Sequence, residues 1–128
     1  MTTIYQDGLV PGNMQVSLGG QVVNSGTAAG AVDSIVGVGF TAVKVGGAGT
    51  GAYQITLSDV YPQVWAVTAS AQSTTTDLTV VVGAITAPTS GANNKIAFAV
   101  LDSSTGAAHD LLNESLHFHL TLVRSNAQ

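Results

Sequence analysis

The chain has 128 residues, contains no cysteine and carries a formal net charge of -4. Its length suits one domain that buries its own core, and the lack of cysteine excludes disulfides, zinc–thiolate sites and iron–sulfur clusters. Charged residues make up 8% of the chain, against about 25% in ordinary soluble domains. With so few Lys and Arg, we expect no binding to nucleic acid or to an anionic membrane surface, and no apolar run approaches the roughly 20 residues of a membrane span.

Residues 1–34 are rich in Gly, Asn, Ser and Thr, and only three apolar residues in this zone alternate as a half-buried strand would. We predict an extended N-terminal arm with one short strand, and a disordered tail is the competing interpretation. If the arm binds a partner, its larger apolar side chains are the expected contacts. These are Tyr5, Leu9, Met14, Val16 and Leu18.

From residue 35 onward, short runs of alternating apolar and polar residues are separated by turn signals, which is typical of strands. Residues 46–51 (GGAGTG) and 59–62 (DVYP) predict turns, and 88–94 predicts a turn-rich loop. Residues 64–71 are apolar or small at nearly every position, which predicts a central strand covered on both faces. The apolar residues that mark the other strands are Val36, Val38, Phe40, Ala42 and Val45; Tyr53, Ile55 and Leu57; Leu78, Val80 and Val82; Ile96, Phe98 and Val100; and Leu116, Phe118, Leu120 and Leu122.

The only helical candidate is a single turn at residues 107–113 (AAHDLLN). About seven short strands with turn signals between them indicate an all-β fold. We therefore predict a single antiparallel β-sandwich or jelly-roll-like domain at residues 35–128, preceded by the N-terminal arm of residues 1–34.

His117 and His119 flank Phe118 in the last predicted strand. Residues two apart on a strand share a face, so both imidazoles are expected to point one way while Phe118 points into the core. This geometry can chelate a first-row metal, with His109 as a third ligand, but no carboxylate has an obvious reason to complete the site. We therefore interpret the two histidines as an exposed or subunit-facing polar pair, with weak metal binding as the alternative, and we expect no cofactor.

Residues 102–110 contain the residue types of a Ser–His–Asp triad, but no GxSxG elbow positions a nucleophile there. Asp102 and Ser103 are expected to cap a turn instead. The glycines of 46–51 are not expected to bind phosphate, because a strand follows them instead of a helix N-terminus and the P-loop lysine is missing. Trp65 is expected in the core or in a subunit interface. The sequence thus predicts no enzyme.

Three short motifs are GAYQITL at 51–57, DVYP at 59–62 and LVRSN at 122–126. Residues 49–72 and 93–126, which contain them, resemble small tailed-bacteriophage virion proteins that are similar to capsid decoration, or cement, proteins. Residues 1–34 take no part in this resemblance.

The resemblance implies a structural protein of the virion that binds the major capsid protein on the outside of a phage head and stabilises it. Such proteins typically act as dimers or trimers with arms that reach across neighbouring capsomers, so a homo-oligomer is expected, a trimer before a dimer. No catalytic residue is implied. A fibre, spike or receptor-binding module of a phage particle is the alternative, and a small hydrolase or metal-dependent enzyme ranks last.

Overall fold

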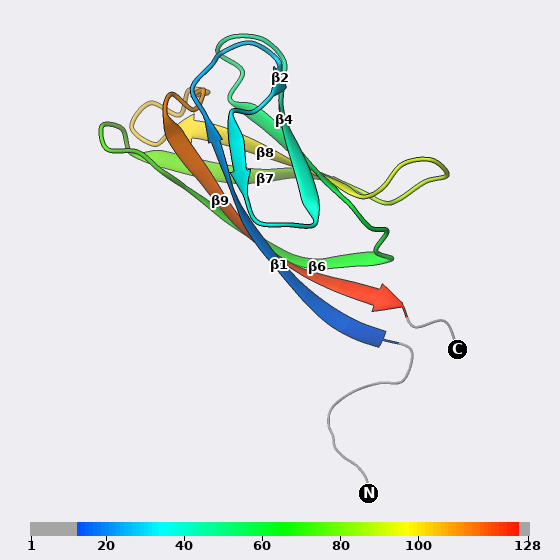
Figure 1. The fold of residues 1–128 in the computed structure, drawn as a ribbon. Helices are drawn as coiled ribbons and strands as arrows, with labels where there is room; N and C mark the ends of the chain where they lie inside the picture. Colours follow the sequence, from blue (N-terminus) through cyan, green and yellow to red (C-terminus); the bar gives the residue numbers. More distant parts are fainter. Residues whose placement is uncertain (1–12, 126–128) are drawn as a thin grey trace, which may run out of the picture.

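The computed structural model describes residues 13–125, which form two antiparallel β-sheets packed on each other (Figure 1). The predicted all-β sandwich is therefore confirmed. The first sheet has the order β3-β1-β9-β6 and the second β2-β4-β5-β8-β7. In chain order the strands are β1 (Asn13–Asn24), β2 (Gly30–Ala31), β3 (Ser34–Val36), β4 (Phe40–Val45), β5 (Ala52–Leu57), β6 (Gln63–Gln72), β7 (Leu78–Thr86), β8 (Lys95–Asp102) and β9 (Glu114–Ser125).

The core lies between the sheets because β5, β8 and β9 each bury every second residue, as a strand with one covered face does. Phe118 of β9 crosses to the second sheet, where its ring packs edge-on against Phe40 with centroids 4.9 Å apart and lies 5.9 Å from Phe98. The other large buried apolar residues are Val22, Tyr53, Ile55, Leu57, Tyr61, Ile96, Val100, Leu111, Leu116, Leu120, Leu122 and Val123.

Strand β1 corrects the predicted division into an arm of residues 1–34 and a domain that begins at 35. All twelve residues of β1 pair with β9, and Gln21, Val22 and Val23 also pair with β3. Val22 is fully buried, and Val16 and Leu18 pack against the core, so these two side chains are core residues and not contacts of a free arm. Met14 lies in the same strand. Tyr5 and Leu9 lie outside the described residues.

Strand β6 is an edge strand, not the predicted central strand covered on both faces. Only β9 pairs with β6, and most β6 residues are exposed. The register shifts between Val64 and Ala66, which makes Trp65 the extra residue of a β-bulge. The Trp65 side chain is 55% exposed and its indole N–H donates to Gln63 Oε1 at 2.7 Å. Trp65 is therefore not a core residue.

The predicted helical turn at residues 107–113 is also wrong, and residues 13–125 contain no helix. This segment instead crosses one end of the sandwich in irregular conformation. Its Leu111 is fully buried, and Ala108 makes an isolated β-bridge with Leu101. No helix in the described part of the chain has the length and apolar character needed to cross a membrane.

The opposite end of the sandwich is closed by a buried amide. Asn94 Oδ1 accepts from the Tyr61 N–H at 2.9 Å, and Asn94 Nδ2 donates to the Tyr61 carbonyl at 2.8 Å. Both polar functions of the Asn94 side chain are thus satisfied by one backbone unit. This pairing holds the turn after β5 and places the Tyr61 ring in the core.

Substitution of two adjacent glycines of β1, Gly19 and Gly20, tests how tightly the two sheets pack against each other. A Cβ at Gly20 would lie 2.5 Å from the Phe40 ring and 3.0 Å from the Phe118 ring, whereas one at Gly19 would meet nothing closer than 3.5 Å. We expect Gly20→Ala to lower the free energy of unfolding by about 1–3 kcal/mol through overpacking. The control Gly19→Ala should leave it unchanged or raise it by up to roughly 1 kcal/mol. Urea denaturation measures both, and equal effects would contradict this packing.

Candidate functional site

The most unusual side chain in the interior is Lys44, which occupies the third inward position of β4. The ion pair that it forms with Asp110 is buried, with side-chain exposures of 0% and 5% and an Nζ–Oδ1 distance of 3.1 Å. Lys44 Nζ also donates to the Gly47 carbonyl at 2.7 Å and to Thr50 Oγ1 at 2.9 Å. The ammonium thus has several partners, which a buried charge requires.

Asp110 ties the loop between β4 and β5 to the segment before β9. Its Oδ2 accepts from the Gly49 N–H at 2.7 Å and its Oδ1 from the Gly51 N–H at 2.8 Å. Burial disfavours the carboxylate, but these two donors and the Lys44 ammonium outweigh it and hold the pKa of Asp110 below its ordinary value. Gly51 has a φ of 57°, and a Cβ there would lie 2.5 Å from the Val100 carbonyl oxygen, so the loop needs glycine at this position.

A second polar group lies beside this pair. Glu114 accepts from the Leu112 N–H at 3.0 Å and lies 2.7 Å from His109 Nε2. Burial opposes ionisation of Glu114, but hydrogen bonds from Ser73, Leu112 and His109 together lower its pKa. The Tyr53 hydroxyl accepts from the Leu111 N–H at 2.7 Å, and burial raises its pKa. These contacts fix the 102–114 connection over the core.

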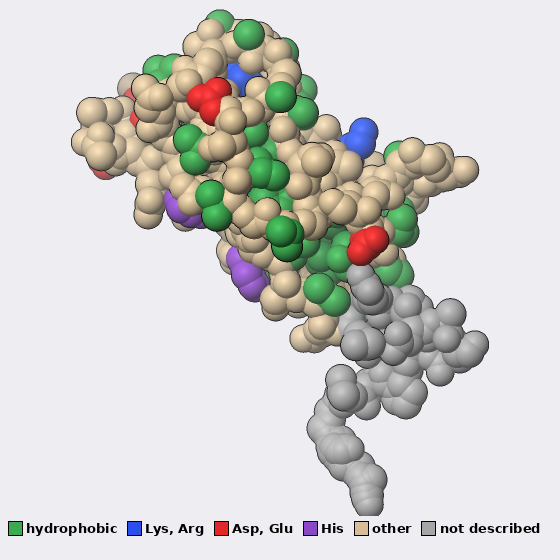
Figure 2. All heavy atoms as spheres, viewed as in Figure 1, with side chains coloured by type: hydrophobic (Ala, Val, Ile, Leu, Met, Phe, Trp, Pro, Cys, Tyr) green, Lys and Arg blue, Asp and Glu red, His purple; other side chains and the backbone are tan. Residues whose placement is uncertain are grey.

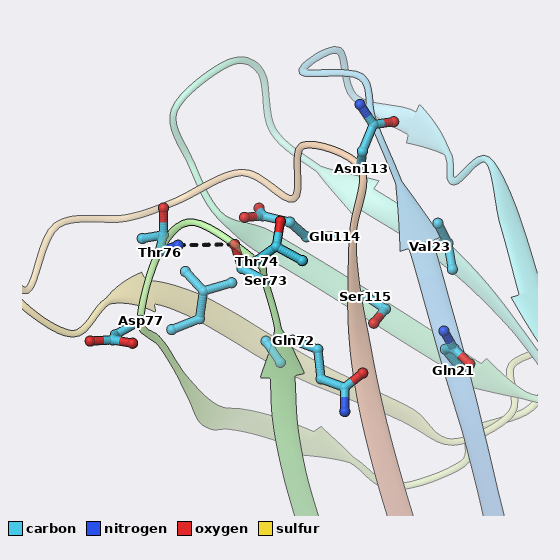
Figure 3. A pocket seen from close by; sticks show the side chains of 12 residues that line it. Gln21, Val23, Gln72, Ser73, Thr74, Thr76, Asp77, Asn113, Glu114 and Ser115 are labelled. Carbon is cyan, nitrogen blue, oxygen red and sulfur yellow. Dashed lines mark hydrogen bonds between the residues drawn. The ribbon is translucent and has the colours of Figure 1, made fainter.

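A hollow of about 740 Å³ lies next to Glu114, between the ends of β1, β6 and β9 and the turn that leads to β7. Figure 3 shows Gln21 of β1, Gln72 of β6 and Ser115 of β9 along its walls, with the turn residues above them. The Ser73 hydroxyl accepts from the backbone N–H groups of Thr75 and Thr76 at 3.1 Å and so shapes that turn. Amides, hydroxyls and carboxylates dominate the lining, and it contains no aromatic residue and no cationic one.

The two predicted outward-facing histidines lie where the sequence placed them. Phe118 is buried between them, His117 is half-buried and His119 is exposed, so the predicted alternation is confirmed. His109 is remote from this face, because Glu114 holds it at the end of the sandwich, and it is therefore not the third ligand considered above. No group of three or more metal-ligating side chains suited to an ion occurs among residues 13–125.

The remaining sequence motifs have structural roles. Asp102 Oδ1 accepts from the Ser104 N–H at 2.9 Å and the Ser104 hydroxyl at 2.7 Å, which confirms its predicted role in a turn. The hydrogen bonds from Ser104 lower the pKa of Asp102. The glycine run 46–51 connects β4 to β5, as predicted. The histidine and the second aspartate of residues 102–110 are engaged elsewhere than in a catalytic triad, His109 by Glu114 and Asp110 by Lys44.

A serine–histidine contact also occurs on the outer face, where Ser115 Oγ lies 2.9 Å from His117 Nε2. Activation of a serine additionally requires a carboxylate on the second ring nitrogen and donors for an oxyanion. The adjacent carboxylate, Glu114, is buried and engaged by His109 and Leu112. The two imidazoles of His117 and His119 are the potential ligands on this face, which is the chemistry that the face can offer.

Sequence reasoning missed the Lys44–Asp110 pair. The alternation Phe40–Ala42–Lys44 contained a signal, because it places a lysine at an inward position of a strand. Comparison of the chain with protein-family models, curated proteins and solved structures finds no match in any of them.

Removing the charge of Asp110 tests the buried pair. We expect Asp110→Asn to lower the free energy of unfolding at pH 7 by about 3–5 kcal/mol, because the Lys44 ammonium loses its counter-charge in the interior. The folded pKa of Asp110 is lowered, so the unfolded chain binds more protons in acid. The stabilisation that the Asp110 carboxylate contributes is complete at pH values well above its ordinary pKa of 3.8. It is lost as the pH falls through the lower pKa of the folded protein.

Urea denaturation between pH 7 and pH 3 measures both effects, and the variant should lack the acid dependence that comes from Asp110. Asp77→Asn, on the exposed turn before β7, is the control and should change stability by less than about 0.5 kcal/mol. Equal stability of Asp110→Asn and the wild type would show that the pair contributes nothing.

Proposed function

We propose that this chain is a structural protein that packs against other proteins, and specifically a decoration protein on the capsid surface of a tailed phage. The supporting observation is the distribution of charge. Every ionisable Asp, Glu or Lys side chain with described exposure is either buried, as Lys44 is, or lies in a loop or at a strand end. On the face drawn in Figure 2, acidic and basic side chains are accordingly few and scattered.

The outer face of the second sheet carries a continuous apolar row. Val45 pairs with Ala52, Ala52 with Ala99, and Ala99 with Val81, so the row crosses β4, β5, β8 and β7. Val45 and Val81 are 44% and 45% exposed. Exposed β-branched residues on a sheet face whose only charged side chains lie at strand ends favour a surface that is covered in the working state. We propose that this face contacts the major capsid protein or further copies of the chain.

The sequence resemblance supports the setting on a phage head, and the uncharged faces are consistent with many weakly bound copies that act through avidity. We propose a homo-oligomer, a trimer before a dimer, bound to the major capsid protein. In this proposal the residues before β1, including Tyr5 and Leu9, contact a neighbouring capsomer, whereas Val16 and Leu18 hold the base of that segment in the sandwich.

A lysine on the apolar row should weaken assembly. We expect Val81→Lys to weaken both self-association and capsid binding by about tenfold or more, because an unpaired ammonium would have to be buried in the contact. Thr68→Lys is the matched control, since Thr68 is an exposed mid-strand residue of the other long edge strand, β6, on the opposite sheet. Light scattering and co-sedimentation with capsids measure the two effects, and equal losses for both variants would contradict the assignment of this face.

Deletion of residues 2–12 tests the proposed clamp without disturbing β1. The truncated protein should unfold with unchanged free energy but occupy fewer capsid sites, because β1 begins at Asn13 and the proposed capsid contact precedes it. Cryo-electron microscopy of decorated particles gives the occupancy. Unchanged occupancy would remove the clamp from the proposal, and absence of the full chain from all capsids would overturn the proposed function itself.

The alternative role, a fibre, spike or receptor-binding module, is favoured by the hollow beside Glu114. Its amides, hydroxyls and carboxylates are groups that hydrogen-bond sugars, although sugar sites usually add an aromatic platform and this lining has none. Binding of the purified protein to host cells or glycans, without binding to capsids, would establish this role instead.

A further inference from the structure

The outer face of the first sheet positions two metal-ligating side chains on its most constrained strand. β9 is hydrogen-bonded on both sides, to β1 and to β6, so the backbone that carries His117 and His119 is held on both edges. Both side chains project from the same face of this strand, because Phe118 between them is buried in the core. Residues two apart on one face of a strand are close enough for both imidazoles to reach a single ion.

The neighbours of the two histidines are small and uncharged. His119 lies between Gly19 and Thr68 of the adjacent strands, and His117 lies between Gln21 and Ser70. Around the pair is a hollow of about 280 Å³, lined by Thr68, Ala69, Ser70, His117, Phe118 and His119.

Neither a lysine charge nor a lack of space opposes a cation at this position. Lys44 and Lys95 belong to the other sheet, so neither places its charge in this hollow. A Cβ added at Gly19 would lie 3.6 Å from His119 Cδ2, so the glycine leaves the flank of that imidazole open. The lining contains neither a carboxylate nor a thiolate, and a donor set of two neutral imidazoles suits zinc, nickel or copper and not calcium or magnesium.

We propose that His117 and His119 chelate one divalent late first-row transition metal ion per chain, with water in the remaining coordination positions. This site is independent of the proposed capsid role. It needs no third protein ligand, which is consistent with the lack of larger ligand clusters among residues 13–125.

Ser115 regulates the geometry of this chelate. Its hydroxyl lies 2.9 Å from His117 Nε2 and so draws that imidazole toward the start of β9. Metal binding through this nitrogen replaces the contact, and side chains on a protein surface change rotamer within nanoseconds. Removing the hydroxyl should therefore raise the metal affinity a few-fold, the equivalent of one neutral hydrogen bond.

Isothermal titration of the full chain, prepared without a polyhistidine tag, with zinc or nickel chloride at pH 7.5 tests the proposal. We expect one ion per chain. Loss of a group that only hydrogen-bonds a metal ligand weakens metal affinity by roughly 10–100-fold. His117→Gln and His119→Gln each remove a ligand itself, so each should weaken binding by more than this. Ser115→Ala should bind a few-fold more tightly than the wild type.

His109→Gln is the matched control, because His109 is engaged by Glu114 at the end of the sandwich and should bind metal like the wild type. Circular dichroism verifies that each variant is folded, which the exposed position of His119 favours. No heat from the wild type, equal binding by His119→Gln and the wild type, or loss of binding in His109→Gln would each overturn the proposal. Unchanged or weaker binding by Ser115→Ala would overturn the chelate geometry through His117 Nε2.

Discussion

One end of the sandwich depends on the buried pair between Lys44 and Asp110. A buried ammonium is tolerated only if hydrogen-bond acceptors and a counter-charge surround it. The segments that supply these groups to Lys44 must therefore pass close to its Nζ atom. Those segments are the loop after β4 and the connection that leads into β9. The pair therefore joins the second sheet to the strand at the centre of the first, and it holds Leu111 over the core.

The two ends of the molecule use different chemistry for the same task. At the far end Asn94 satisfies one backbone unit of Tyr61 with a neutral amide, which carries no desolvated charge and no acid dependence. At the near end the carboxylates of Asp110 and Glu114 have lowered pKa values, so acid should loosen this end first. Because polar contacts at the two ends fix the loops, the sheet faces between them need no charged side chains to specify the fold.

The sequence predicted the parts of this fold that local patterns decide. The inward faces of β5, β8 and β9 follow from strict alternation, as does the outward direction of the two histidines beside Phe118. The sequence predicted a short strand in this zone but missed the full length of β1 and its place in the sandwich, because Gly19 and Gly20 interrupt the apolar alternation. Pairing with β9 and the ring of Phe40 explain these two glycines. The burial of Lys44 was missed because its partner lies far along the chain, and spacing alone does not reveal which loop closes over a strand end.

The edges of the two sheets argue for an assembled working state. On one side each sheet ends in a very short strand, β2 or β3, which offers few unpaired backbone groups to another chain. On the other side the edges are β6 and β7, which are long, contain no charged residue, and are interrupted only by a bulge in each. Apart from these bulges, the two edges lack the lysine and proline that often protect an exposed edge strand. We propose that neighbouring proteins limit access to the free edges of β6 and β7, because uncharged strands of this length suit a protein that works in contact with others.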